Sequence, residues 1–122
     1  MPTLDEQLLH DLVIHQVKVK YSKIHKEVYI NPGEKKNFEV QGLYPDIVFG
    51  GYGQITQIIE VETEGNLNKE RVPYWENLAR TGKQFTILVA KQHQRTLTDL
   101  LWKTGLMGKV KVATFDIVFE HL

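Results

Sequence analysis

The stretch YPDIVFGGYGQITQIIEVET, residues 44–63, decides the fold that we expect of this chain. Its first part, residues 44–49, is an apolar run with a proline near its start, where a strand tolerates the missing N–H. The GGYG that follows predicts a turn. Residues 55–63 form a second run, apolar enough for a strand in the middle of a sheet. The stretch therefore predicts two neighbouring strands joined by a tight turn.

Helices and strands are also predicted on both sides of this stretch. Apolar residues at spacings of three and four predict helices at residues 3–22, 66–81 and 94–106. Short apolar runs bounded by turn residues predict strands at residues 26–31, 84–90 and 110–119. The order is then α-β-β-β-α-β-α-β, in which the first three strands form an antiparallel meander and the strand–helix–strand steps are parallel right-handed crossovers. We expect one α/β (α+β) domain over residues 1–122, with a mixed sheet flanked by helices.

Two of the helices have local start signals. Thr3 is the predicted N-cap of the first helix, with Glu6 as its capping-box partner. Asn66 or Asn68 is the predicted cap of the second helix, which Gly82 ends. The first helix also has one broad apolar face that we expect to pack on the sheet, formed by Leu4, Leu8, Leu9, Leu12, Val13 and Val17.

Composition limits the classes of function. The chain of 122 residues has no cysteine, which excludes disulfides, cysteine-based zinc sites and a thiol nucleophile. Its apolar runs are too short to cross a bilayer and it begins without a signal core, so we expect a soluble cytoplasmic protein with no membrane partner. Fifteen basic and fifteen acidic residues balance to zero, whereas nucleic-acid binders are usually basic. If the acidic residues 46, 60, 62 and 64 surround a metal, however, the remaining surface is positive.

The two central strands carry carboxylates that geometry can bring together. Glu60 and Glu62 leave the same face of the strand at residues 55–63. Asp46 stands at the start of the preceding strand, and a pairing that sets it beside Glu60 would make three carboxylates converge. Such charges repel unless a cation offsets them, and their hard oxygens suit Mg²⁺ or Mn²⁺. The alternative is that Pro45-Asp46 is an ordinary turn dipeptide and that the glutamates reach solvent.

These two segments resemble a known motif. Residues 44–48 (YPDIV) and 58–62 (IIEVE) look like the motif of the PD-(D/E)xK superfamily, which holds restriction endonucleases, archaeal Holliday-junction resolvases and related repair nucleases. The predicted order α-β-β-β-α-β is similar to the restriction-endonuclease-like core, with the last helix and strand as an addition. The resemblance implies that Asp46 and Glu60 bind the metal and that Glu6 or Asp11, in the first helix, adds an outer ligand.

The chain departs from the superfamily pattern at one position. A lysine usually stands there to orient the attacking water, but this chain has Glu62, as some active restriction enzymes of the superfamily do. Glu62 could serve as a base or as a ligand of a second metal. Lys69 or Lys91 could supply the missing lysine. A decayed, inactive member would show the same departure, and the variant Glu62→Lys, which restores the pattern, is expected to leave the fold intact.

The resemblance implies a metal-dependent endonuclease. We expect it to hydrolyse phosphodiester bonds of nucleic acid, with DNA as the expected substrate, Mg²⁺ or Mn²⁺ as cofactor and a homodimer as the working form. The alternatives are a catalytically inactive nuclease-like module that binds nucleic acid or a protein partner, and a metal-dependent hydrolase of another phosphate ester. The histidines lack metal-ligand spacing, so His10 and His15 are predicted to be ordinary partly buried or surface residues.

Overall fold

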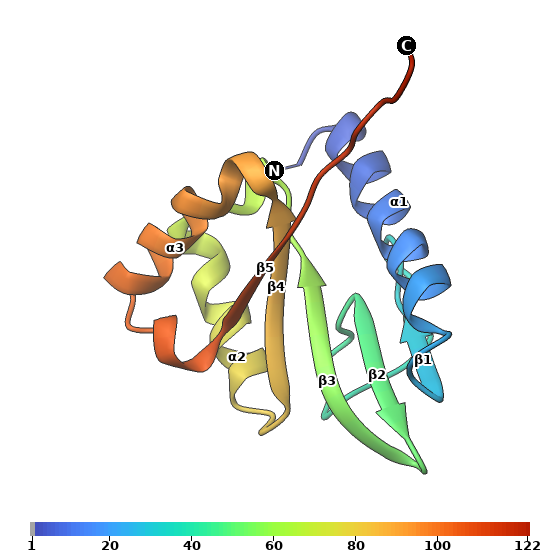
Figure 1. Cartoon of the computed structure of the whole chain (residues 1–122). Coiled ribbons are helices and arrows are strands. Elements are labelled where there is room, and N and C mark those ends of the chain that lie inside the picture. The colour runs from blue at the N-terminus through green and yellow to red at the C-terminus, as the bar shows by residue number, and fades with distance from the viewer. Residues whose placement is uncertain (1) are drawn as a thin grey trace.

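The computed structural model describes residues 2–122 and contains a five-stranded sheet and three α-helices (Figure 1). Strands β1, β2 and β3 pair antiparallel, whereas β3, β4 and β5 pair parallel, in the order β1-β2-β3-β4-β5. The predicted α/β class and the mixed sheet are therefore confirmed. The elements are α1 (Leu4–Tyr21), β1 (Glu27–Ile30), β2 (Ile47–Gly51), β3 (Gln54–Val61), α2 (Val72–Ala79), β4 (Gln84–Ala90), α3 (Gln94–Lys103) and β5 (Lys111–Phe115).

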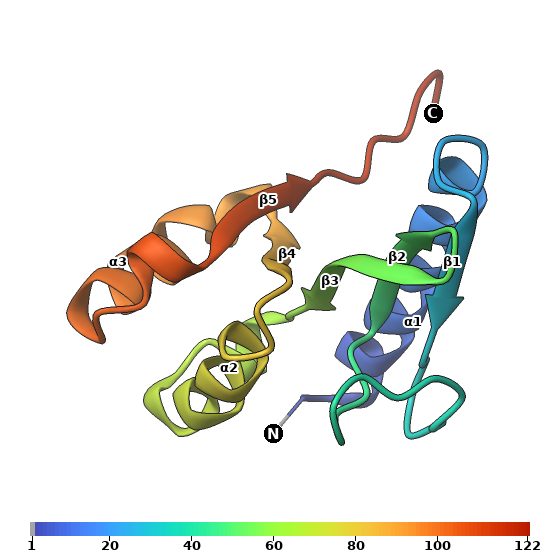
Figure 2. The ribbon, with the colours of Figure 1, turned by 90° about the horizontal axis from the view of Figure 1, so that it is seen from below.

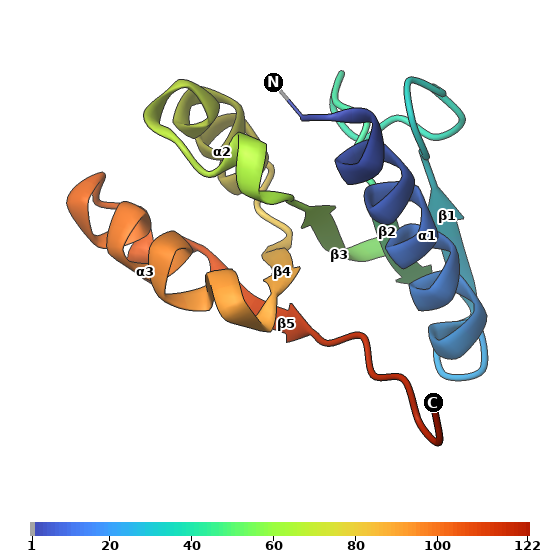
Figure 3. The ribbon, with the colours of Figure 1, turned by 90° about the horizontal axis from the view of Figure 1, so that it is seen from above.

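The helices cover the two faces of the sheet unequally. Helices α2 and α3 lie on one face, and α1 lies on the other (Figures 2 and 3). Side chains alternate along each strand, so each face has its own apolar cluster. The cluster under α2 and α3 includes Val48, Ile58, Trp75, Leu78, Ile87, Val89, Leu97 and Leu101. The cluster under α1 includes Val13, Ile14, Ile47, Phe49, Ile59, Val61 and Leu88.

A β-bulge sets the register of β2 against β3. Gly51 pairs with Gln54, so the connection is the two-residue loop Tyr52-Gly53, and both residues have positive φ, as a type I′ turn requires. The register then shifts by one residue between Phe49 and Gly50. Only glycine fits at position 50, because a Cβ there would lie 2.5 Å from the Gln54 carbonyl oxygen.

The inward face of α1 differs from the predicted one. Thr3 caps the helix as expected, with its hydroxyl oxygen 3.1 Å from Glu6 N. Val13 and Ile14 are buried, and Leu9, Val17 and Tyr21 pack against them. Leu4, Leu8 and Leu12, however, are 71%, 63% and 51% exposed, so their predicted burial is wrong. The sequence has two overlapping apolar stripes along this helix, and the helix turns the stripe with Val13, Ile14 and Val17 toward the sheet.

The start of α2 is also displaced from the prediction. Two 3₁₀ turns, Glu64–Asn66 and Lys69–Arg71, occupy the stretch before Val72. Neither predicted cap acts on α2, because Asn66 donates to the Glu62 carboxylate and Asn68 donates to the Gly65 carbonyl oxygen. Pro73 falls in the first turn of α2, where its missing N–H has no helical acceptor. The α-helix can therefore begin only just before this proline.

Two other predicted elements end early. Strand β5 ends at Phe115, not at residue 119, because Phe115 pairs with Ala90, the last residue of its partner strand β4. Helix α3 ends at Lys103, three residues short of the predicted end.

No helix within residues 2–122 combines the length and the apolar composition that crossing a bilayer requires.

The orientation of α1 can be tested by matched truncations on its two faces. Replacing the fully buried Ile14 by alanine should lower the free energy of unfolding by about 2–5 kcal/mol, because it leaves a cavity against the sheet. Replacing the exposed Leu8 by alanine should change it by less than about 0.5 kcal/mol. Urea denaturation of both variants measures the difference, and equal losses would contradict this orientation of α1.

Candidate functional site

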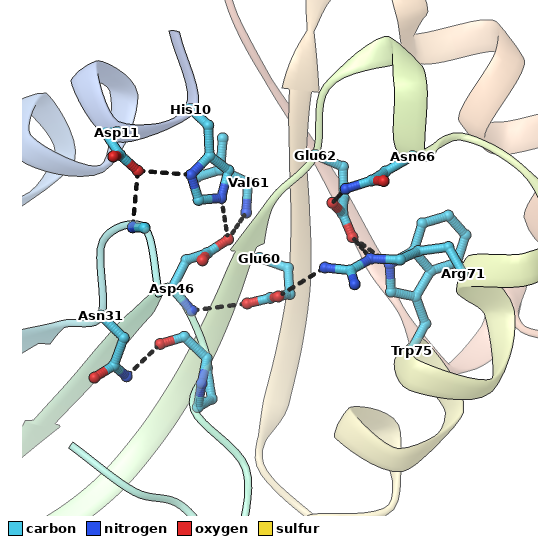
Figure 4. Close-up of polar contacts among 12 residues, drawn as sticks. His10, Asp11, Asn31, Asp46, Glu60, Val61, Glu62, Asn66, Arg71 and Trp75 are labelled. Atoms are coloured by element: carbon cyan, nitrogen blue, oxygen red, sulfur yellow. Dashed lines mark hydrogen bonds and ion pairs between the residues drawn. The ribbon is translucent and has the colours of Figure 1, made fainter. Parts of the chain in front are cut away.

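The bulged hairpin sets Asp46 opposite Glu60. Ile47 pairs with Ile59, so the next residues along the two strands face each other, and Asp46 N donates to Glu60 Oε2 at 2.7 Å. Both side chains are buried, with 7% of Asp46 and 2% of Glu60 exposed. The register that the sequence left open is therefore the one that brings these two carboxylates together (Figure 4).

Helix α1 supplies a partner that the sequence did not indicate. His10 Nε2 lies 3.0 Å from Asp46 Oδ2, which also accepts the Val61 N–H at 2.8 Å. His10 Nδ1 lies 2.9 Å from Asp11 Oδ1, and that oxygen accepts the Gly33 N–H at 2.9 Å. His10 is partly buried, as predicted, but the prediction missed its two carboxylate partners. Asp46 lies 36 positions away, so no local spacing could have indicated the contact.

The two carboxylates around His10 favour its charged form. Burial opposes a charge on the ring, but hydrogen bonds to Asp46 and Asp11, with their negative charges, outweigh it and raise the pKa of His10 to about 9. An imidazole with a carboxylate at each nitrogen must donate at both, which only the protonated ring can do. His10 is therefore an imidazolium at neutral pH.

Glu62 turns away from the other two carboxylates. Its side chain is 1% exposed and points to the segment leading into α2 (Figure 4). Glu62 Oε2 accepts from Arg71 Nε at 2.8 Å and from Trp75 Nε1 at 2.6 Å. Arg71 Nη2 also lies 3.5 Å from Glu60 Oε1. Arg71 thus stands between the two glutamates. Within residues 2–122, no three His, Cys, Asp or Glu side chains form a group that could hold a metal ion.

Burial and charge shape the ionisation of the site. Burial raises the pKa of the Glu60 carboxyl well above its usual value, and the charges of Asp46 and Glu62 add to the effect. Burial also raises the pKa of Glu62, although Arg71 and Trp75 oppose it. In the part of the chain that the structure describes, every buried side-chain nitrogen and oxygen has a hydrogen-bond partner. The buried polar atoms of the site are therefore all engaged in hydrogen bonds.

Asp46 and Glu60 line an open cleft of about 500 Å³. Lys35 and Lys36, from the loop between β1 and β2, lie on its wall together with Arg71, which precedes α2. The two carboxylates are buried, whereas both lysines are exposed. The cleft therefore combines buried negative groups with exposed positive ones.

Asn31 holds the loop that carries these lysines. The side chain is 2% exposed. Its Oδ1 accepts from the N–H groups of Asn37 and Phe38, each at 2.8 Å. Its Nδ2 donates to the carbonyl oxygens of Phe38 at 2.9 Å and Pro45 at 2.7 Å. One buried amide thus makes four hydrogen bonds to the loop backbone, which fixes the loop beside the cleft.

The other residues proposed from the sequence lie apart from Asp46 and Glu60. The Glu6 carboxylate accepts the Gly65 N–H at 2.9 Å and lines a neighbouring cavity of about 310 Å³, as Asp11 does. Lys69 and Lys91 are exposed on 3₁₀ turns and lie outside the lining of the cleft. Among residues 2–122, the cations that the structure brings to the carboxylates are His10 and Arg71.

The contacts of Glu62 reverse the expectation for the variant Glu62→Lys. A lysine there would set two cations side by side in a buried site and leave Trp75 Nε1 without an acceptor. We expect a loss of about 3–5 kcal/mol in the free energy of unfolding, measured by chemical denaturation. Glu64→Lys is the matched control, because Glu64 is 78% exposed, and it should change stability little. Equal stability of the two variants would contradict the buried pairing.

The pKa of His10 predicts a dependence of stability on pH. The folded-state pKa of about 9 lies above the ordinary histidine value of 6.5. The stability that His10 contributes is therefore complete below about pH 6.5 and is lost as the pH rises through 9. The contribution of His10 is isolated by comparing the unfolding free energies of the wild type and of His10→Gln at several pH values. Their difference should shrink from neutral to alkaline pH, and a constant difference would contradict the assignment.

Comparisons with known proteins find no match for this chain. No family model matches the chain, no curated protein matches it, and no solved structure matches it. The resemblance of residues 44–48 and 58–62 to the PD-(D/E)xK motif therefore stays a prediction, and the chemistry of the site is deduced from its own residues.

Proposed function

We propose that this chain is a divalent-metal-dependent endonuclease that hydrolyses phosphodiester bonds. The observation that carries the proposal is the pair of buried carboxylates, Asp46 and Glu60, held side by side in a cleft that also exposes Lys35 and Lys36. A phosphodiester needs a cation at the reacting phosphate and positive groups along the neighbouring backbone. The two carboxylates can hold the cation, and the two lysines supply the positive groups.

The donor set fits Mg²⁺ or Mn²⁺. These ions need only one or two carboxylates, because water and substrate phosphate oxygens complete their coordination. Both hydrogen bonds to Asp46 end on Oδ2, so Oδ1 takes neither of them. Glu60 Oε1 has a long 3.5 Å contact with Arg71, and Tyr74 also hydrogen-bonds to the Glu60 carboxyl. A bound ion would supply an activated water and would stabilise the charge that develops on the phosphate.

The remaining residues prepare this pair for a ligand. His10 and the Val61 N–H hold Asp46 Oδ2, and Asp46 N holds Glu60 Oε2. Such outer contacts orient the carboxylates before any ligand arrives. Arg71 is 30% exposed, so its guanidinium can also face an anion in the cleft.

Nucleic acid is the substrate class that we propose, with DNA as the expected form. The motif resemblance of residues 44–48 and 58–62 supports it, as do the exposed lysines of the cleft. The order of elements from α1 to β4 supports a restriction-endonuclease-like core as part of the same proposal.

One observation favours the second candidate, a nuclease-like module that binds nucleic acid or a protein partner without cutting. Glu62, at the position where the superfamily usually has its lysine, is engaged by Arg71 and Trp75 and turned toward α2. Lys35 and Lys36 line the cleft, but among the described residues no lysine forms an ion pair with Asp46 or Glu60. Binding without cleavage is the outcome that would distinguish this candidate.

A cleavage assay with isosteric variants tests the proposal. Asp46→Asn and Glu60→Gln keep the shape of each side chain and one acceptor oxygen but remove the charges that a metal needs. Each should lower Mg²⁺- or Mn²⁺-dependent cleavage of linear, single-stranded, flap and four-way-junction DNA by at least about 100-fold. Calorimetry with Mn²⁺ should show that both variants lose metal binding.

The matched control is Glu76→Gln, because Glu76 pairs only with Arg80 on the surface of α2. It should cleave like the wild type. DNA binding by a wild type that neither cleaves nor takes up metal would reject the nuclease in favour of the inactive module. Cleavage that survives in Asp46→Asn would remove this site from the reaction.

A further inference from the structure

Arg71 stands at the boundary between the buried glutamates and the open cleft. Its side chain is 30% exposed, whereas those of Glu60 and Glu62 are 2% and 1% exposed. Arg71 also lines the cleft together with Asp46 and Glu60. One charged side chain thus contacts both buried glutamates and borders the space that a ligand would enter.

The guanidinium of Arg71 uses only one of its two edges for the glutamates (Figure 4). Nε donates to Glu62 Oε2 at 2.8 Å, and Nη2 lies 3.5 Å from Glu60 Oε1. The planar group has five N–H donors, so its end edge keeps an N–H on each of Nη1 and Nη2. Nη1 has no hydrogen-bond partner among residues 2–122, where every buried side-chain nitrogen has one. Nη1 is therefore open to solvent.

The neighbours of Arg71 fix the orientation of this free edge. Trp75 Nε1 donates at 2.6 Å to the Glu62 oxygen that also accepts from Arg71 Nε, which holds that carboxylate in place. The Tyr74 ring stacks against the guanidinium, with its centroid 4.2 Å from Arg71 Cζ. Tyr74 also hydrogen-bonds to the Glu60 carboxyl. An arginine that is oriented before its ligand arrives loses little side-chain entropy on binding.

Two cavities meet at Arg71. One is the cleft of about 500 Å³ that contains Asp46 and Glu60. The other has a volume of about 450 Å³, and Arg71 lines it together with Asn66 and Asn68. A ligand held at Arg71 can therefore extend in both directions, as an internal phosphate of a chain has to.

The free edge of Arg71 suits a phosphodiester. Its two N–H groups match the two non-bridging oxygens of a phosphate, which arginine binds in a bidentate manner. Lys35 and Lys36 are exposed along the same cleft and can balance the charge of neighbouring phosphates. These further cations favour a ligand with several phosphates over one with a single carboxylate.

We propose that Arg71 binds the phosphodiester in the cleft directly, with N–H groups of Nη1 and Nη2 donating to its two non-bridging oxygens. Glu62, which stands apart from the carboxylate pair, holds Arg71 in this orientation. The inference rests on the proposed function for the class of ligand and adds the side chain that contacts it. It does not require cleavage, so it applies equally to a module that binds nucleic acid without cutting.

A dinucleotide with a single phosphate tests the contact. Thymidylyl-thymidine has one phosphodiester, and its methylphosphonate analogue has a methyl group in place of one charged oxygen. NMR titration of the Asp46→Asn variant without divalent metal measures both affinities, so that neither a metal nor cleavage contributes. The phosphodiester should bind at least about tenfold more tightly than the analogue, because only the diester offers a charged acceptor to both N–H groups.

Removing both partners of the buried ion pair isolates the contribution of Arg71. In the Asp46→Asn background, Arg71→Gln combined with Glu62→Gln removes both charges and still leaves Trp75 an amide oxygen as acceptor. The preference for the phosphodiester should fall below about twofold, with the affinity for the analogue unchanged. Glu62→Gln alone keeps Arg71 and should keep the preference. Lys69→Gln removes a cation of the same turn outside the cleft and should keep it too.

Arg71→Lys is a second variant that retains a cation beside both glutamates. Lysine lacks the planar fork, so the preference for the phosphodiester should fall at least about threefold. The amide spectra of the same samples show whether each variant is folded.

Three results would overturn the proposal. The first is a background protein that binds both dinucleotides equally or binds neither. The second is a preference that survives in the folded double variant or is unchanged in Arg71→Lys. The third is loss of the preference in either control. Each of them leaves the proposed nuclease standing if the wild type cleaves DNA. A wild type that never cleaves, with a preference that depends on Arg71, would reject the nuclease and support the phosphate contact.

Discussion

The one-residue bulge between β2 and β3 is the constraint on which the site depends. Gly50 permits it, and beyond it Ile47 pairs with Ile59. Without the shift, Asp46 would stand opposite Ile59, and Glu60 would lose its backbone partner. Because strand side chains alternate between faces, a slip of one residue exchanges an inward carboxylate for an apolar side chain. A feature of the backbone thus places the two carboxylates that we assign to chemistry.

Charge compensation then ties the surrounding elements to this hairpin. Buried carboxylates are costly unless they are paired, and the two cations come from opposite sides of the sheet. His10 comes from α1, and Arg71 comes from the turn before α2. The packing of both faces is therefore linked to the site. Such pairing fixes the positions of the carboxylates and explains how the cluster tolerates burial.

The open edge at β5 follows from the same arrangement of helices around the sheet. Both crossovers place their helices on one face of the sheet, so a single helix has to cover the other face. Helix α1 is held over the β1–β3 part of that face by Val13, Ile14 and the His10–Asp46 contact. Its position completes the site and leaves a groove beside β5 uncovered. The uncovered groove and the candidate site thus follow from one placement of α1.

The sequence by itself determined the α/β class, the order of the elements, the mixed sheet and the Thr3 cap, because these depend on local periodicity and capping chemistry. It also indicated Asp46 and Glu60, since strand alternation and a short turn restrict where they can lie. Only the tertiary structure decided which stripe of α1 faces inward, that β5 stops with its partner, and that His10 joins Asp46 while Glu62 turns to Arg71. Those outcomes depend on packing and pairing between residues far apart in the chain, which no local pattern records.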